Sequence, residues 1–139
     1  IGDWSSDVCS SDLILAPYLK DPRNFFVVSS DFCHWGRRFS FQWKNEKLGP
    51  IHKSIEWLDR KGMEHIEKGS SKDFSLYLKK YENTICGRHP ISLLLNALEQ
   101  HSEEVYKIKF TRYSQSDQCR HISDSSVSYA SAVVTCVGD

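Results

Sequence analysis

The sequence predicts an α/β fold built on a partial sheet, and three observations lead to that prediction. The apolar run N-F-F-V-V at residues 24–28 does not alternate with polar residues, which is typical of a strand covered on both faces in a parallel sheet. Helical periodicity follows over residues 50–100, and apolar and polar residues alternate after residue 105, as in a strand with one buried face. Three strands and three helices are too few to close both faces of a sheet.

The predicted helices are read in chain order. Residues 50–68 place an apolar stripe between charged residues, which indicates an amphipathic helix that lies on a sheet. Ser70 is the expected N-cap of a second helix that runs to Tyr81, with Asp73 in its first turn. Pro90 suits the first position of a third helix, which we expect over residues 91 to about 100.

Two further strands are predicted near the C-terminus. Apolar residues at 106, 108 and 110 alternate with lysines, so this strand has one face in solvent. A polar loop over residues 114–126 leads to a final strand over residues 127–137, rich in small and β-branched residues.

Composition limits the class of protein. Hydrophobic residues make up 40% and charged residues 26%, with 18 basic against 18 acidic side chains. We therefore expect no nucleic-acid partner and no membrane insertion, and the lack of a signal-like segment favours a cytoplasmic location. Five cysteines, an odd number without a C-x-x-C pair, are expected to be reduced thiols rather than a disulfide framework.

The first thirteen residues differ from the rest. Residues 2–13 read G-D-W-S-S-D-V-C-S-S-D-L, which resembles the translation of a sequencing adapter. We therefore divide the chain into a non-native or disordered segment, 1–13, and a domain, 14–139.

The motif S-S-D-F-C-H-W-G, residues 29–36, directly follows the first predicted strand. Ligands of open α/β sheets collect beyond the carboxyl ends of strands, so Asp31 and His34 are candidate site residues. Each has an ordinary alternative: Asp31 can cap a turn, His34 can be a core histidine, and Cys33 is expected to be buried packing.

The motif C-G-R-H-P, residues 86–90, offers a second candidate. Cys86 precedes a helix N-terminus beside an arginine and a histidine, features that prepare a thiol for metal binding or reaction. From this motif alone, a small buried cysteine at a turn is slightly favoured. Arg88 also stands at the start of the predicted helix, so we expect it to share a pocket with Asp31 and His34.

Four separated segments resemble the Memo family, the mediators of receptor-driven cell motility. They are F-V-V-S-S-D-F-C-H-W-G, Y-L-K-K-Y-E-N-T-I-C-G-R-H-P, Q-S-D-Q-C-R and D-S-S-V-S-Y-A. The resemblance implies a three-layer α/β/α fold like that of class III extradiol (non-haem iron) dioxygenases. It also implies that Cys86 is a metal ligand and that Asp31 and His34 line the pocket beside the metal.

The resemblance covers only the C-terminal half of a Memo protein. Neither of the family's N-terminal histidine motifs, H-A-G-Y and P-S-H-H, occurs in this sequence. We therefore expect copper or iron in the full-length protein, no stably bound metal in this chain, and no activity of this chain alone.

Three classes of function are considered, of which the resemblance implies the first two and the residues themselves the third. The first is a cytosolic signalling effector that links receptor tyrosine kinases to cytoskeletal regulators and cell motility, with phosphotyrosine-containing receptor segments as partners. The alternative is a redox metalloenzyme, a copper-dependent oxidase of the extradiol-dioxygenase-like superfamily. The third is a hydrolase in which Cys86 acts without metal and His34 or His89 is the base. The sequence does not identify the metal, the substrate or the receptor.

Overall fold

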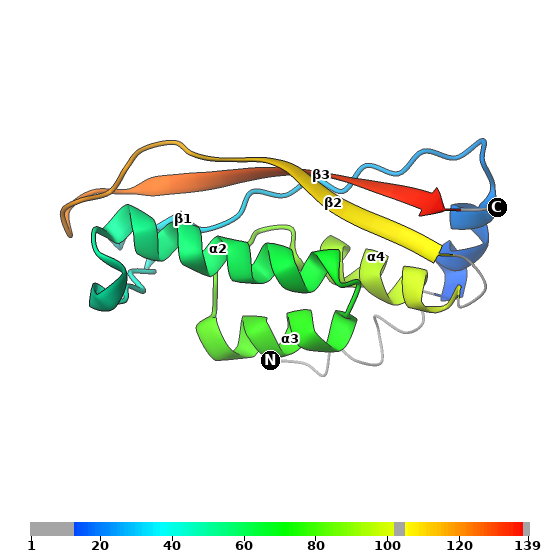
Figure 1. The fold of residues 1–139 in the computed structure, drawn as a ribbon, viewed down its shortest axis with the longest axis horizontal. Helices are drawn as coiled ribbons and strands as arrows, with labels where there is room; N and C mark the ends of the chain where they lie inside the picture. Colours follow the sequence, from blue (N-terminus) through cyan, green and yellow to red (C-terminus); the bar gives the residue numbers. More distant parts are fainter. Residues whose placement is uncertain (1–12, 102–104, 138–139) are drawn as a thin grey trace.

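A long antiparallel ribbon with helices packed on one side of it makes up most of the fold (Figure 1). The computed structural model describes residues 13–101 and 105–137. The sheet has three strands in the order β1-β3-β2: β1 (His34–Trp35), β2 (Val105–Gln115) and β3 (Ser126–Val137). The presence of both helices and strands confirms the mixed α/β class. Both strand pairings are antiparallel, so the prediction of a parallel sheet is wrong.

The helices follow the predicted order. They are α2 (Ile51–Glu67), α3 (Ser71–Tyr81) and α4 (Arg88–Glu99), with a further helical segment over residues 13–20 and two short 3₁₀ helices, η1 (Arg37–Phe39) and η2 (Glu46–Leu48). Ser70 is the N-cap of α3 as predicted, since its side chain accepts a hydrogen bond from the backbone N–H of Asp73 at 3.1 Å. The predicted start of the last helix was two residues late, because Pro90 occupies the third position of α4 and not the first.

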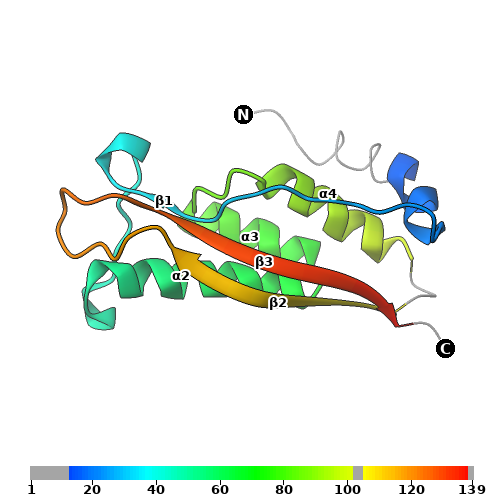
Figure 2. The same cartoon turned by 90° about the horizontal axis from the view of Figure 1, so that it is seen from above.

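The apolar run at residues 24–28 is not a strand, which corrects the prediction of a strand buried on both faces. Phe25 is 90% exposed and Val27 is 79% exposed. Figure 2 shows this segment running lengthwise on the β3 side of the ribbon, and it joins the sheet only at β1. A buried strand needs a hydrogen-bonded neighbour and a cover on each face, and the part of the chain that the structure describes supplies neither here.

The two long strands form most of the sheet. Residue Val105 pairs with Val137 at one end and Gln115 with Ser128 at the other, with a register shift between Phe110 and Arg112. Ile108 is buried while the flanking lysines are exposed, which confirms the predicted solvated face. Beyond Ala130, β3 is exposed up to Val137.

Two apolar clusters form the core. The larger lies among α2, α3, α4 and the ribbon, and includes Phe32, Leu58, Phe74, Ile85 and Leu95. The smaller holds Cys33, Trp35, Ile55 and Cys119, so the prediction that Cys33 is buried packing is confirmed. Cys33, Cys86 and Cys119 are free thiols, as predicted.

Two further predictions concern the adapter-like segment and membrane insertion. The adapter-like segment, residues 1–13, lies outside the described residues except for its last position. None of the helices in residues 13–101 and 105–137 is both long and apolar enough to cross a bilayer.

Candidate metal site

Two loops that are distant in sequence meet at the candidate site. One, residues 29–33, enters β1, and the other, residues 82–87, connects α3 to α4. The backbone N–H of Gly87 donates to Ser30 Oγ at 2.9 Å and holds the loops together. A Cβ at position 87 would lie 2.7 Å from the carbonyl oxygen of Ser29, so only glycine allows this approach.

Three side chains converge where the loops meet. The carboxylate of Asp31, a ring nitrogen of His34 and Sγ of Cys86 all lie within 4.8 Å of one another. His34 Nε2 is 3.9 Å from Asp31 Oδ2, and the two side chains are 21% and 45% exposed. The structure therefore brings together three of the four residues that the sequence placed in one pocket.

Thr84 fixes the orientation of His34. The Thr84 hydroxyl accepts from the backbone N–H of His34 at 2.7 Å and donates to its carbonyl at 2.9 Å. The carbonyl oxygen of Thr84 lies 2.8 Å from His34 Nδ1. Because a carbonyl only accepts, Nδ1 carries the proton in the neutral ring, which leaves the lone pair of Nε2 on the side of Asp31.

Cys86 is an exposed thiol, which corrects the buried cysteine favoured from its motif alone. The backbone N–H of Asp31 donates to its sulfur at 3.2 Å, and Ser30 Oγ lies 4.0 Å from the same atom. The residue stands just before the N-terminus of α4, where the helix dipole favours negative charge. Both features suit a sulfur that bears negative charge, as a metal-bound thiolate does.

Arg88 and His89 occupy the first turn of α4. The guanidinium of Arg88 donates to the carbonyl of Ile85 at 3.2 Å, within its own turn, and the side chain is exposed. Partial burial, and then the charge of Arg88, lower the pKa of His89. The geometry thus ties Arg88 to the loop of Cys86, and it is not among the three converging donors.

The orienting residues Ser30 and Thr84 were missed by the sequence analysis. Thr84 is 50 positions from His34, and a lone threonine in a polar loop gives no periodic or motif signal. The contact follows only from the way in which α2 and α3 return the chain to β1.

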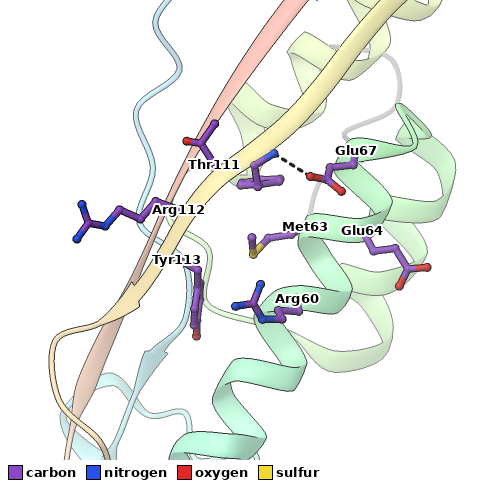
Figure 3. A pocket seen from close by; sticks show the side chains of 8 residues that line it. Arg60, Met63, Glu64, Glu67, Thr111, Arg112 and Tyr113 are labelled. Atoms are coloured by element: carbon purple, nitrogen blue, oxygen red, sulfur yellow. Dashed lines mark hydrogen bonds between the residues drawn. The ribbon is translucent and has the colours of Figure 1, made fainter.

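A cavity elsewhere in the fold is separate from this site. It has a volume of about 350 Å³ and lies between α2 and β2, where Arg60, Met63 and Tyr113 point toward one another (Figure 3). None of the three converging donors lines it. The candidate site is therefore a cluster of donors between two loops, apart from this cavity.

The fold and the donor cluster define a class of protein: an α/β protein with a thiol, an imidazole and a carboxylate gathered between a strand and a helix N-terminus. Comparison with known sequences gives the family. The family model described as Memo-like protein matches residues 6–133, so the chain belongs to the Memo-like family, as its motifs predicted.

Similar proteins occur across animals. The chain is 52% identical over 124 residues to Protein MEMO1 of Homo sapiens, a match that covers 88% of this chain and 42% of the relative. It is 54% identical to Protein MEMO1 of Rattus norvegicus with the same coverage. Protein memo-1 homolog of Caenorhabditis elegans is 47% identical over 125 residues, 87% of this chain and 36% of that protein. The chain spans about two fifths of the length of these relatives.

Proposed function

We propose that Asp31, His34 and Cys86 form one side of a copper or iron site in a Memo-family protein. The observation that carries this proposal is the approach of their donor atoms to within 4.8 Å, from two loops separated by helices α2 and α3. Chance clusters of acidic side chains are common on surfaces, but this cluster combines three donor types and a fixed imidazole.

The donor chemistry fits these metals. Thiolate and imidazole are ligands for Cu(I), and imidazole with carboxylate suits iron. When bound, such a metal would supply Lewis-acid or one-electron redox chemistry. In this chain the N–H of Asp31 would support the charge on the sulfur of Cys86, and Thr84 would hold His34 with Nε2 free to bind.

Three protein donors are few for a stable site, because structural metal sites usually have four. We infer that the remaining ligands belong to the part of the family's length that this chain does not span. The histidine motifs of the resemblance would supply them. The chain alone should accordingly bind metal weakly.

For the whole protein we propose a cytosolic signalling effector that couples receptor tyrosine kinases to cytoskeletal regulators. Membership of the Memo-like family supports this proposal. A phosphotyrosine-containing receptor segment is the proposed partner, and its binding to the whole protein can be measured with a phosphorylated peptide against its unphosphorylated form.

Competition with a chromogenic Cu(I) chelator tests the metal site. The 139-residue chain should take up Cu(I) weakly, Cys86→Ser should abolish the uptake, and Cys136→Ser, which removes an exposed thiol on β3, should leave it unchanged. Thermal unfolding of each variant shows whether it is folded. Equal uptake by the Cys86 and Cys136 variants, or loss of the fold in Cys86→Ser alone, would make the thiol non-specific or structural.

A copper-dependent oxidase is a second candidate, and the thiol in the donor set favours it, since soft thiolate ligands stabilise Cu(I). Oxygen uptake by the whole protein with copper and a reductant would distinguish an oxidase from an adaptor. Hydrolysis by Cys86 needs no metal, so chelation that abolishes activity would exclude it.

A further inference from the structure

Asp59 is a carboxylate in the interior of the fold. It lies in the middle of α2 with 0% exposure, and it is the only buried carboxylate among residues 13–101 and 105–137. Desolvation makes such a position costly unless several donors compensate. An apolar residue of similar size would often serve stability as well, so the carboxylate calls for a further reason.

Several segments donate hydrogen bonds to this carboxylate. Its Oδ1 accepts from the backbone N–H of Cys33 at 3.1 Å and from Asn83 Nδ2 at 2.9 Å. Its Oδ2 accepts from the hydroxyl of Tyr113, on β2, at 2.8 Å. One side chain therefore connects helix α2, the start of β1, the loop before α4 and the edge of the sheet.

Two of these donors belong to the loops that carry the candidate metal site. Cys33 stands between Asp31 and His34, and Asn83 adjoins Thr84, the residue that orients the His34 ring. Both loops are thus anchored to the same oxygen atom, Oδ1 of Asp59. The distance between the loops sets the distance between the sulfur of Cys86 and the other two donors.

We propose that Asp59, on α2, is a positioning residue that sets the distances between the metal donors through its hydrogen bonds to the two loops. The inference rests on the proposed metal site. The two hydrogen bonds to Oδ1 of the buried carboxylate hold the two loops at a fixed separation. The hydrogen bond from Tyr113 to Oδ2 stops the carboxylate from rotating. Orienting contacts behind metal ligands typically account for 10- to 100-fold in metal affinity.

The chain offers a matched pair of variants. Asn83→Ala removes the bond between Asp59 and the Cys86 loop, together with the hydrogen bond from Asn83 Nδ2 to the Tyr77 hydroxyl. Tyr113→Phe removes the bond from β2 to the same carboxylate, together with the contacts of its hydroxyl to Ser128 and Gln115. Asn83→Ala should weaken Co(II) binding by roughly 10-fold or more and reduce the thiolate-to-Co(II) charge-transfer band. Tyr113→Phe should keep both within about twofold at a comparable loss of stability.

A conservative substitution gives the second comparison. Asp59→Asn keeps an oxygen that can accept at the Oδ1 position and should retain most Co(II) affinity, while Asp59→Leu should lose it. Ile66→Ala, a core truncation at the far end of α2, shows what instability alone does to Co(II) binding. If Asp59→Leu does not fold, the comparison of Asn83 with Tyr113 decides.

A metal-free measurement separates this inference from the proposed function. The backbone N–H of His34, bonded to Thr84, should exchange with solvent at least tenfold faster in Asn83→Ala than in Tyr113→Phe. If the wild-type chain takes up no Co(II), the Cu(I) competition tests the metal proposal and amide exchange alone decides on Asp59. Equal effects of the two variants on exchange, or equal effects on Co(II) binding where the wild type binds, would make Asp59 a purely structural residue.

Discussion

At the scale of single residues, Gly87 occupies the tightest contact between the two loops of the site. A Cβ there would lie 2.5 Å from Ser30 Oγ and 2.7 Å from the carbonyl oxygen of Ser29. Backbone atoms cannot yield as a flexible side chain can, so an added methyl group must push the loops apart.

We predict that Gly87→Ala destabilises the chain by about 1–3 kcal/mol and weakens metal binding with it. Chemical denaturation and Co(II) titration measure the two effects. Gly69→Ala is the control, because Gly69 has a φ of 69° but no atoms within 4 Å of the added Cβ. That variant should lose stability through backbone strain while keeping its metal affinity, and a parallel loss of affinity would contradict the prediction.

The second prediction at this scale concerns pH. Burial raises the pKa of Asp59 above its usual 3.8, although the hydrogen bonds from Ser128, Asn83, Tyr113 and the N–H of Cys33 oppose the shift. A carboxyl with a raised pKa takes up a proton on folding, so its stabilising contribution is present at low pH and is lost as the pH rises through the folded-state pKa.

Wild type should therefore lose stability relative to Asp59→Asn as the pH increases from about 4, with a limiting slope of about 1.4 kcal/mol per pH unit. Urea denaturation at pH values from 4 to 7 measures this difference. A difference that grows in favour of wild type with rising pH would mean that the hydrogen bonds outweigh desolvation.

At the scale of elements, β2 is an edge strand with a hydrogen bond from outside the sheet. Glu67 is the last residue of α2. Its Oε1 accepts a hydrogen bond at 2.8 Å from the backbone N–H of Phe110, which lies at the register shift of β2 (Figure 3). Edge strands with unpaired N–H groups invite pairing with other chains, and this carboxylate covers one such group.

We predict that Glu67→Ala costs about 1 kcal/mol and speeds exchange of the Phe110 amide, because a charge-assisted hydrogen bond is lost at a largely exposed site. Glu64→Ala is the matched control, since Glu64 lies on the same helix and forms ion pairs with Lys61 and Lys68. Denaturation and NMR-detected exchange compare the two. Equal exchange of the Phe110 amide in both variants would show that the register shift in β2 is stable without the hydrogen bond to Glu67.

The same scale shows what the sequence could predict. Helices α2 and α3 and strand β3 were predicted within one or two residues, because their apolar periodicity and the Ser70 cap are local signals. The apolar run at residues 24–28 has an equally clear local pattern, yet a strand also needs a partner. The pairing of Asp31 with Cys86 spans 55 positions, and no local spacing encodes it; only the family motifs pointed to it.

At the scale of the whole molecule, large apolar side chains are exposed on the two long strands and along the extended segment beside β3. Exposed members are Phe25, Val27, Val105, Val133 and Val137. A surface of this kind is typical of an interface. The relatives are more than twice as long as the matched region, so their unmatched part is the natural candidate to cover it.

We predict that the chain binds the unmatched segment of Protein MEMO1 of Homo sapiens when the two are co-expressed. Burying these side chains supplies the driving force, at about 25 cal/mol per Å² of apolar area. Phe25→Asp with Val27→Asp should prevent co-purification, while Leu76→Asp, an exposed position on α3, should not. Co-purification that survives the double substitution would place the interface elsewhere.

The separation of the two site loops also has a consequence for folding order. Asp31 and Cys86 are 55 positions apart, with α2 and α3 between them. Contacts between distant positions incur their loop-closure entropy before they stabilise the fold, and such contacts slow folding. The three donors should therefore come together late in refolding, after most helical structure has appeared. A metal added at the start of refolding would find at most one loop of its site, and binding would report the completion of the fold.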